Sequence, residues 1–223
     1  MSKEKAKAFK VKIDNESFYV EDEEITGAEL LELANKSGSK FSLYLKDKGK
    51  SNPVGPNDIV DLSDPGVEKF ITIAKDLTEG EQDSALSSEK GAKREEFQLP
   101  TIDKEYLESQ GYVWETIIEN NVSRLVIRNF KVPKGYNQKE VEINLRIPTC
   151  YPDQQIDMAY IYPYLELESK QGIKGIASDN FESKRWQRWS RHRTKENPWR
   201  AGIDGVETHL LTVEEWLKRE VSK

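Results

Sequence analysis

The stretch Ile147-Pro148-Thr149-Cys150-Tyr151-Pro152 decides how this chain is interpreted. An alternating apolar run, Val141 to Leu145, leads into it, and a second run, Met158-Ala159-Tyr160-Ile161-Tyr162, ends at Pro163. Proline has no N–H to donate to a strand ladder, so each proline marks the end of a strand. The stretch also holds Cys150, the single cysteine of the chain. The two runs therefore predict two strands, and Cys150 is a first candidate for chemistry.

Length and composition predict one large or two small folded domains. The chain has 223 residues, of which 36% are hydrophobic and 33% charged. Nine tyrosines, seven phenylalanines and five tryptophans argue against global disorder. No run approaches the roughly 20 apolar residues that a membrane span needs, and the first residues lead into no signal-type apolar region. We therefore expect a cytoplasmic protein that does not contact a membrane.

Cysteine content and charge narrow the chemistry. One cysteine allows neither an intramolecular disulfide nor a cysteine-based metal cluster, and no glycine-rich phosphate loop is present, so we expect no metal and no cofactor. The net charge is −6, yet residues 97–223 carry 19 basic and 19 acidic residues. Nucleic-acid binding by the whole chain is therefore not expected.

Residues 9–76 predict a small α+β domain. Alternating apolar residues predict strands near 9–13, 17–20, 41–45, 58–62 and 70–73. Thr26 is placed to cap a helix, with Glu29 as its capping-box partner. The order strand, strand, helix, strand, strand, strand is close to the ubiquitin-like β-grasp fold. The pieces 11–14, 25–31 and 60–62 resemble the bacterial multi-ubiquitin domain family.

Residues 77–96 are polar and poor in large apolar side chains, which predicts a flexible linker. A conjugatable ubiquitin-like protein ends in Gly-Gly, and neither this segment nor Glu220-Val221-Ser222-Lys223 has that pair. The first domain is therefore interpreted as a fused module rather than as a modifier ready for conjugation. A processing site after Gly80 or Gly91 remains an alternative.

Residues 97–223 predict a second α+β domain. Asp103 is placed to cap a short helix that runs through Leu107. Strands are expected at 114–118, 125–127 and 141–145, and a helix with an apolar stripe at 204–218. His209 lies inside that last helix and is expected to be structural.

The second domain resembles the prokaryotic family E of ubiquitin-conjugating-enzyme-like proteins. The matching motifs are Trp114-Glu115, Pro133-Lys134-Gly135-Tyr136, Tyr151-Pro152-Asp153, Asp157-Met158, Trp186 to His192 and Trp199 to Gly205. The resemblance implies a bacterial ubiquitin-like conjugation system and a role in phage defence. It also implies three partners: a ThiF-type ubiquitin-activating-like enzyme, a ubiquitin-like modifier and a JAB-type isopeptidase.

The resemblance also shows what this sequence lacks. In eukaryotic conjugating enzymes a His-Pro-Asn tripeptide follows the last strand, and here its place is taken by Tyr162-Pro163-Tyr164. Trp199 corresponds to the tryptophan that opens the next helix in those enzymes. Counting back from it puts Ser190 or Arg191 where the catalytic cysteine would stand. The usual thioester carrier is therefore missing from its usual place.

Ser190 is the leading candidate for an unconventional acyl carrier. Its hydroxyl would hold the modifier as an oxyester if a base took its proton. His192 would face the same side if the segment is extended, and Asp157 or Asp179 would orient that histidine. The alternative is a loop serine beside a structural histidine. Cys150 is the fallback nucleophile, and its alternative is a small half-buried residue at a strand end.

The segment from Lys184 to Arg200 contains seven basic residues, one acidic residue and three tryptophans. Tryptophan and arginine are common anchors at protein interfaces, and the same mixture binds single-stranded nucleic acid. The tryptophans would alternatively belong to the core. We favour core packing combined with protein docking, with partner-binding candidates Trp186, Arg188, Trp189, Arg191 and Trp199.

The leading functional hypothesis is a conjugating-enzyme-like protein that accepts an activated modifier C-terminus and transfers it to an amine. The runner-up is a catalytically inactive binding module or scaffold for the modifier and its activating enzyme, which the missing cysteine and asparagine support. A nucleic-acid-binding adaptor is a third hypothesis.

Overall fold

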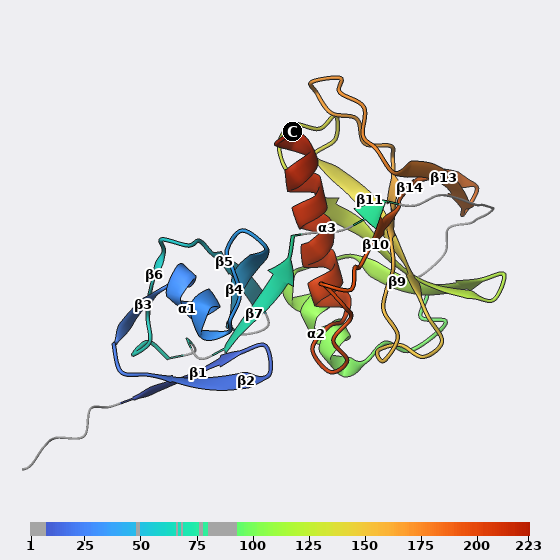
Figure 1. Ribbon diagram of the computed structural model, residues 1–223. Coiled ribbons are helices and arrows are strands. Elements are labelled where there is room, and N and C mark those ends of the chain that lie inside the picture. Colours follow the sequence, from blue (N-terminus) through green and yellow to red (C-terminus); the bar gives the residue numbers. More distant parts are fainter. Residues whose placement is uncertain (1–7, 48–49, 66, 68, 76–77, 80–92) are drawn as a thin grey trace, which may run out of the picture. The chain divides into compact units, whose positions relative to one another are not determined.

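The computed structural model describes residues 8–47, 50–65, 67, 69–75, 78–79 and 93–223 of the chain. These residues divide into two compact units, Met1–Lys75 and Asp76–Lys223 (Figure 1). Each unit has its own hydrophobic core and is described by itself.

The first unit is built on a mixed sheet of five strands in the order β2-β1-β7-β4-β5. Strands β1 and β7 run parallel, and the other neighbours run antiparallel. A small second sheet pairs β3 with β6. This arrangement is the expected ubiquitin-like α+β fold, with β3 and β5 as strands that the sequence did not predict. The bounds are β1 Phe9–Ile13, β2 Glu16–Val20, β3 Glu24–Thr26, β4 Phe41–Asp47, β5 Lys50–Val54, β6 Ile59–Asp61 and β7 Lys69–Ala74.

Helix α1 (Gly27–Leu33) begins as the sequence predicted. The Thr26 side chain accepts a bond from the N–H of Glu29, and the Glu29 carboxylate accepts one from the N–H of Thr26, which completes the capping box. Leu30 and Leu31 are buried against the sheet. A Cβ at Gly27 would lie 2.2 Å from the carbonyl oxygen of Gly55. Glycine is therefore required where the helix starts, because the backbone of another segment approaches so closely.

The second unit contains an antiparallel sheet of six strands in the order β13-β14-β12-β11-β10-β9. The two runs around the opening stretch become β11 and β12, which pair with each other as Glu142–Tyr162, Ile143–Ile161 and Asn144–Tyr160. Strands β13 and β14 were not predicted. The bounds are β9 Trp114–Glu119, β10 Val122–Lys131, β11 Glu140–Ile147, β12 Ala159–Tyr162, β13 Ile176–Phe181 and β14 Lys184–Trp189.

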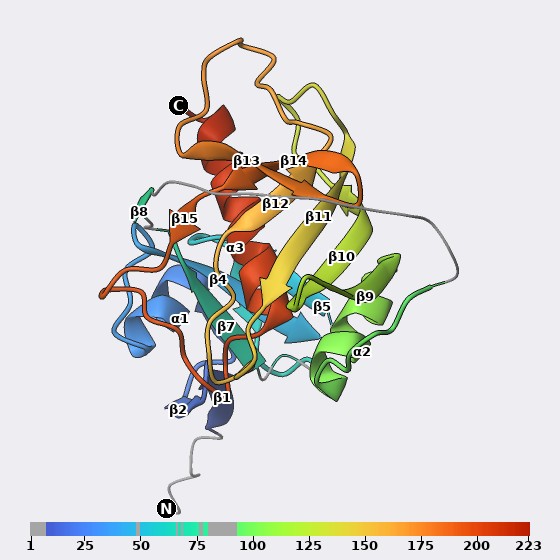
Figure 2. The same cartoon turned by 90° about the vertical axis from the view of Figure 1, so that its right-hand side faces the viewer.

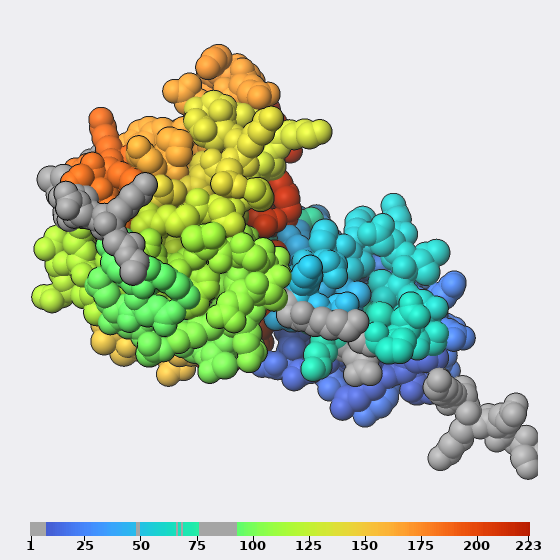
Figure 3. Space-filling view, turned by 180° about the vertical axis from the view of Figure 1, so that it is seen from behind, coloured from blue at the N-terminus to red at the C-terminus, as the bar shows by residue number. Residues whose placement is uncertain are grey.

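Two helices, α2 (Thr101–Ser109) and α3 (Val206–Val221), join this sheet in the main core of the unit. Figure 2 looks onto the sheet with α3 behind the strands. The core between them includes Leu107, Phe130, Trp189 and Trp216, each 2% exposed or less. In the space-filling view of Figure 3, the green surface belongs to the α2 and β9 segments and the adjoining yellow surface to the β11 segment.

The prediction that Asp103 caps α2 is wrong. The N-cap of α2 is Pro100, and no side chain bonds to that end of the helix. Asp103 instead accepts hydrogen bonds from the hydroxyl of Tyr151 at 2.6 Å and from the N–H of Val206 at 3.1 Å. The Tyr151 hydroxyl also lies 3.0 Å from that N–H. Asp103 therefore caps α3, more than a hundred residues away in sequence, and ties the opening stretch to it.

The described residues of the predicted linker segment form backbone hydrogen bonds with strands of the second unit. Strand β8 (Thr78–Glu79) runs antiparallel to β15 (Arg191–His192). Further along, the N–H of Thr116 donates to the carbonyl of Arg94, and Arg94 forms an ion pair with Glu115 at 2.8 Å. Most of the linker prediction, residues 80–92, lies outside the described residues. Within the described chain, no helix is long and apolar enough to cross a membrane.

Candidate functional site

Asp157 and His192 form a hydrogen-bonded pair at the surface of the second unit. The Nδ1 of His192 lies 2.9 and 3.0 Å from the two carboxylate oxygens of Asp157. About a third of each side chain is exposed, 32% for His192 and 31% for Asp157. His192 lies on the extended strand β15, and Asp157 immediately precedes Met158 and β12. A carboxylate on Nδ1 orients the ring and leaves Nε2 available for proton transfer, which is the geometry of a general base.

The backbone of the same strand holds another chain segment. Thr78 pairs with His192, and Glu79 pairs with Arg191. Residues 78–79 come four to five positions after β7, the last strand of the ubiquitin-like unit. The chain that leaves a ubiquitin-like fold is therefore added as a strand next to the Asp157–His192 pair.

Ser190 does not join this pair. It is 1% exposed, and its Oγ lies 4.0 Å from the sulfur of Met158. Its N–H donates to the carbonyl of Gly175 at 2.9 Å. Residues two positions apart on a strand point to the same side only while the strand is regular. Ser190 lies at the break between β14 and β15, so this rule does not hold for Ser190 and His192. A hydroxyl buried in this way is closed to a modifier tail, so the geometry does not support Ser190 as an acyl carrier.

Cys150 is exposed, in the turn that follows β11. Its carbonyl accepts a bond from the N–H of Gln154 at 2.9 Å. A nucleophilic role for Cys150 stays a prediction, because an accessible thiol is necessary for that role and does not by itself demonstrate it.

Trp186 and Trp189 are core residues, and their predicted part in partner binding is contradicted by their burial. Both are 0% exposed. Three residues apart on one strand, they face opposite sides of the sheet, Trp189 in the main core and Trp186 in a smaller cluster with Tyr160 and Phe181. Each indole N–H is satisfied internally, that of Trp186 by the carbonyl of Phe181 at 2.9 Å and that of Trp189 by the Gln187 side chain at 2.9 Å.

The arginines of this segment are also buried. Arg188 is 4% exposed and Arg191 is 2% exposed. Arg191 lies 3.1 Å from Glu220 of α3. Trp199 is half-buried, and its indole N–H donates to the carbonyl of Pro152 at 2.8 Å. Of the five candidates, Trp199 therefore keeps the most accessible surface. It lies in the turn before α3 and does not open that helix, which begins at Val206.

Asp179, the other candidate to orient His192, is fully buried elsewhere. Its Oδ2 lies 3.4 Å from Arg124 and 2.8 Å from Arg146. Arg124 and Arg146 were missed by the sequence analysis, since they lie on two separate strands and nothing in the sequence shows that these strands place them opposite each other.

His209 has the structural role that the sequence predicted. It is 2% exposed, and its Nε2 donates to the carbonyl of Met158 at 2.8 Å. Burial lowers the pKa of His209 to about 4, and the bond to Met158 only partly opposes that effect. His209 is therefore neutral at physiological pH and belongs to the core.

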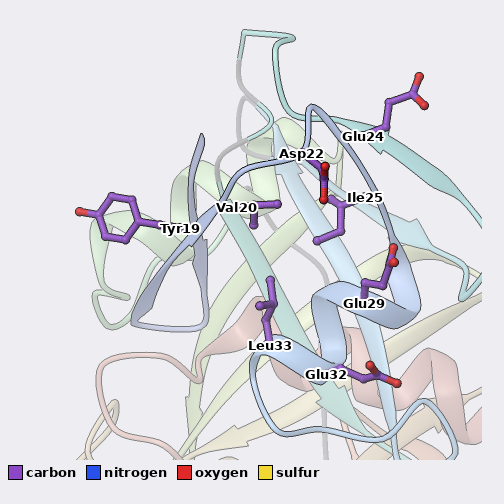
Figure 4. Close-up of a pocket in the computed structure, with 8 residues that line it drawn as sticks. All are labelled: Tyr19, Val20, Asp22, Glu24, Ile25, Glu29, Glu32 and Leu33. Atoms are coloured by element: carbon purple, nitrogen blue, oxygen red, sulfur yellow. The ribbon is translucent and has the colours of Figure 1, made fainter. Parts of the chain in front are cut away.

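The first unit carries an open, acidic pocket of about 450 Å³ (Figure 4). Asp22, Glu24, Glu29 and Glu32 line it together with a few apolar side chains, and Figure 4 shows Tyr19 pointing away from the rest. Glu29 is already engaged in the capping box of α1. Over the described ranges of the chain, no group of three or more histidine, cysteine or acidic side chains is placed to hold a metal ion.

The two units, with the family models that match them, define a protein of the ubiquitin-conjugating-enzyme-like class, joined to a ubiquitin-like unit. Residues 99–220 match the family model described as Prokaryotic E2 family E, and residues 9–75 match the model described as Multiubiquitin. The chain therefore belongs to the prokaryotic E2 family E and has a conjugating-enzyme-like role, which implies contact with an activating enzyme and a ubiquitin-like modifier. Searches of curated proteins and of solved structures gave no match.

Proposed function

We propose that this protein works in a bacterial ubiquitin-like conjugation system by holding the C-terminal tail of a modifier along β15. The pairing of β8 with β15 carries the proposal, because it brings the segment that follows a ubiquitin-like fold next to His192. Strand addition uses main-chain bonds, so the same edge would accept the tail of a separate modifier in place of β8.

The Asp157–His192 pair would then act as the base in transfer to an amine. The modifier would arrive as a thioester on a ThiF-type activating enzyme. The amine nitrogen attacks the tail carbonyl, the carbon–sulfur bond breaks, and the thiolate leaves. The Nε2 of His192 takes the proton lost by the amine, and Asp157 stabilises the resulting imidazolium. No covalent intermediate on Ser190 is needed, and a JAB-type isopeptidase would reverse the product.

A second candidate function is binding without chemistry, in which the protein positions the modifier or its activating enzyme as a scaffold. The burial of Ser190 favours this candidate, because it removes the serine as a nucleophile. The two functions share the tail-binding strand and differ in whether His192 transfers a proton.

The test is an assay with the activating enzyme, modifier, ATP and an amine acceptor, with the amide product measured by mass spectrometry. His192→Gln and Asp157→Asn should each lower the rate, His192→Gln by about 10²-fold. Asp153→Asn, an exposed aspartate in the same loop, is the control and should leave the rate unchanged.

Three results would redirect the proposal. An unchanged rate in His192→Gln would refute the role of the base. Tail binding without product in the unaltered protein would establish the scaffold. A covalent adduct that hydroxylamine removes and thiol does not would restore an oxyester on serine, while a thiol-labile adduct would point to Cys150.

A further inference from the structure

Three arginines gather on one side of the sheet in the second unit, the side that carries Tyr160 and Trp186. Arg124 of β10 stands directly opposite Arg146 of β11. Arg188 of β14 stands directly opposite Tyr160 of β12. The guanidinium carbons of Arg146 and Arg124 lie 4.7 and 5.8 Å from the centre of the Tyr160 ring. We call Arg124, Arg146 and Arg188 the arginine cluster.

Among the described residues, the arginine cluster lies near two carboxylates, Asp179 and Glu119. One carboxylate oxygen of Asp179 forms ion pairs with both Arg124 and Arg146. The charge of Glu119 also interacts electrostatically with Arg124. In the part of the chain that the structure describes, these two carboxylates act on Arg124 and Arg146, and no ion pair is formed by Arg188. Burial and the neighbouring Arg146 lower the pKa of Arg124, while Asp179 and Glu119 act in the opposite direction.

Several polar atoms in and beside the arginine cluster are buried and have no hydrogen-bond partner among the described residues. Arg188 is 4% exposed, and neither its Nε nor its Nη2 has a hydrogen-bond partner. The Nε atoms of Arg124 and Arg146 are also buried without a hydrogen-bond partner. The same holds for the side-chain nitrogen and oxygen of the fully buried Asn144. Asn144 stands opposite Tyr160, next to the cluster. Arginine cannot shed its charge, and a buried charge without a partner is strongly unfavourable.

The kinds of unpaired atoms indicate what they would bind. The donors are five nitrogen atoms: the three arginine Nε atoms, the Nη2 of Arg188 and the Nδ2 of Asn144. A carboxylate offers two oxygens, whereas a phosphate group offers four, and guanidinium groups match phosphate geometry well. Two buried acceptors, the Oδ1 of Asp179 and the Oδ1 of Asn144, also lack a donor. Hydrogen phosphate carries a P–OH group that would supply one.

We propose that the arginine cluster, together with Asn144 and Asp179, is a binding site for a hydrogen phosphate group. The Arg146 side chain is 35% exposed, so the site opens to solvent at that arginine. Phosphate is preferred over sulfate at this site, since sulfate has no proton to donate to Asp179 or Asn144. The proposal uses none of the residues assigned to proton transfer and does not depend on the function proposed for β15.

The experiment is thermal unfolding of the full chain at pH 7 in chloride, sulfate and phosphate at equal ionic strength. Phosphate should raise the unfolding temperature by about 2 °C or more over chloride, because ligand binding to the folded state stabilises it. Sulfate controls for the general stabilisation that such salts give to any protein, and its effect should be smaller. Phosphoserine, tested alongside, distinguishes a free phosphate from a phosphomonoester. Equal shifts in phosphate and sulfate would overturn the proposal.

Two variants locate the effect. Arg188→Met removes the unpaired charge with little loss of length, so its unfolding temperature in chloride should be no lower than that of the unaltered protein. Its extra response to phosphate should disappear. Arg185→Met is the control, because Arg185 is exposed on the same strand and bonds to Ser178. If Arg188→Met retains the phosphate response, the site is refuted. If it does not fold, calorimetric titration of the partly exposed Arg146→Gln with phosphate decides, and undiminished binding there also refutes it.

Discussion

The two histidines of the chain have opposite surroundings. His192 is partly exposed and bonded to a carboxylate. His209 is buried, bonds to the carbonyl of Met158, and lies perpendicular to the Trp216 ring with the ring centres 5.7 Å apart. The sequence predicted the structural role of His209 from its place inside an apolar helix. It paired Ser190 as the acyl carrier with His192 as its base, because burial depends on strands that come from other parts of the chain and is not visible locally.

At the residue scale, we expect His209 to make stability depend on pH. The folded state keeps His209 neutral with a pKa of about 4, while the unfolded chain accepts a proton near pH 6.5. The unfolded state therefore binds more protons between these values, and stability is full above pH 6.5 and lost as the pH falls toward 4. Urea unfolding at pH 7 and pH 5 should show a loss of about 2 kcal/mol from this group.

The comparison that isolates His209 uses two glutamine variants. His209→Gln keeps a donor for Met158 and should lose this part of the pH dependence, while His192→Gln should retain it because His209 is unchanged. Equal pH slopes in His209→Gln and in the unaltered protein would contradict the prediction.

At the scale of elements, the N-terminus of α3 depends on residues from elsewhere in the chain. Its N-cap, Gly205, has no side chain, so the N–H of Val206 is served by Asp103 of α2 and the hydroxyl of Tyr151. The sequence located α3 through its apolar stripe. It assigned Asp103 to the wrong helix, since spacing along the chain favours local caps and says nothing about distant ones.

Tyr151→Phe should destabilise the second unit by about 1–2 kcal/mol. The ring would still pack near Trp199, but the hydroxyl that bonds to Asp103 at 2.6 Å would be gone and a buried carboxylate would lose a donor. Chemical unfolding followed by tryptophan fluorescence measures the change. Tyr19→Phe, at a site 69% exposed, is the control and should change stability by less than about 0.5 kcal/mol. A loss no larger than that in Tyr151→Phe would show that the bond does not stabilise the fold.

At the scale of the whole molecule, the chain builds two separate cores. The core of the first unit includes Val11, Ile13, Leu30, Leu43 and Phe70, each 2% exposed or less. All five strands of its main sheet, in the order β2-β1-β7-β4-β5, come from that unit. Residues 8–75 therefore have the contacts of an independent domain, although a domain of this size is marginally stable.

We expect the isolated segment 8–75 to unfold cooperatively, because its core and its sheet are complete. Circular dichroism during thermal unfolding is the measurement. Leu30→Ala should lower the stability of the fragment by about 2–5 kcal/mol, since it leaves a cavity under α1. Ile59→Ala, at a site 66% exposed, should have little effect. A fragment without a cooperative transition would show that the first unit does not fold alone.

The sequence by itself determined the two domains, the capping box of α1 and the strands around Tyr151-Pro152, because these features rest on local periodicity and local hydrogen bonds. Strand β14 was not predicted, because residues on both faces of it are buried and the usual polar–apolar alternation is absent. Burial does alternate along β13, but its buried positions hold Ala177, Asp179 and Phe181, so the sequence shows no apolar alternation there. Only the tertiary structure decided that Ser190 is enclosed, that β8 lies along His192, and that three arginines meet around Tyr160. Each of these depends on which strands pair and in what register, and that is set by the packing of the whole unit.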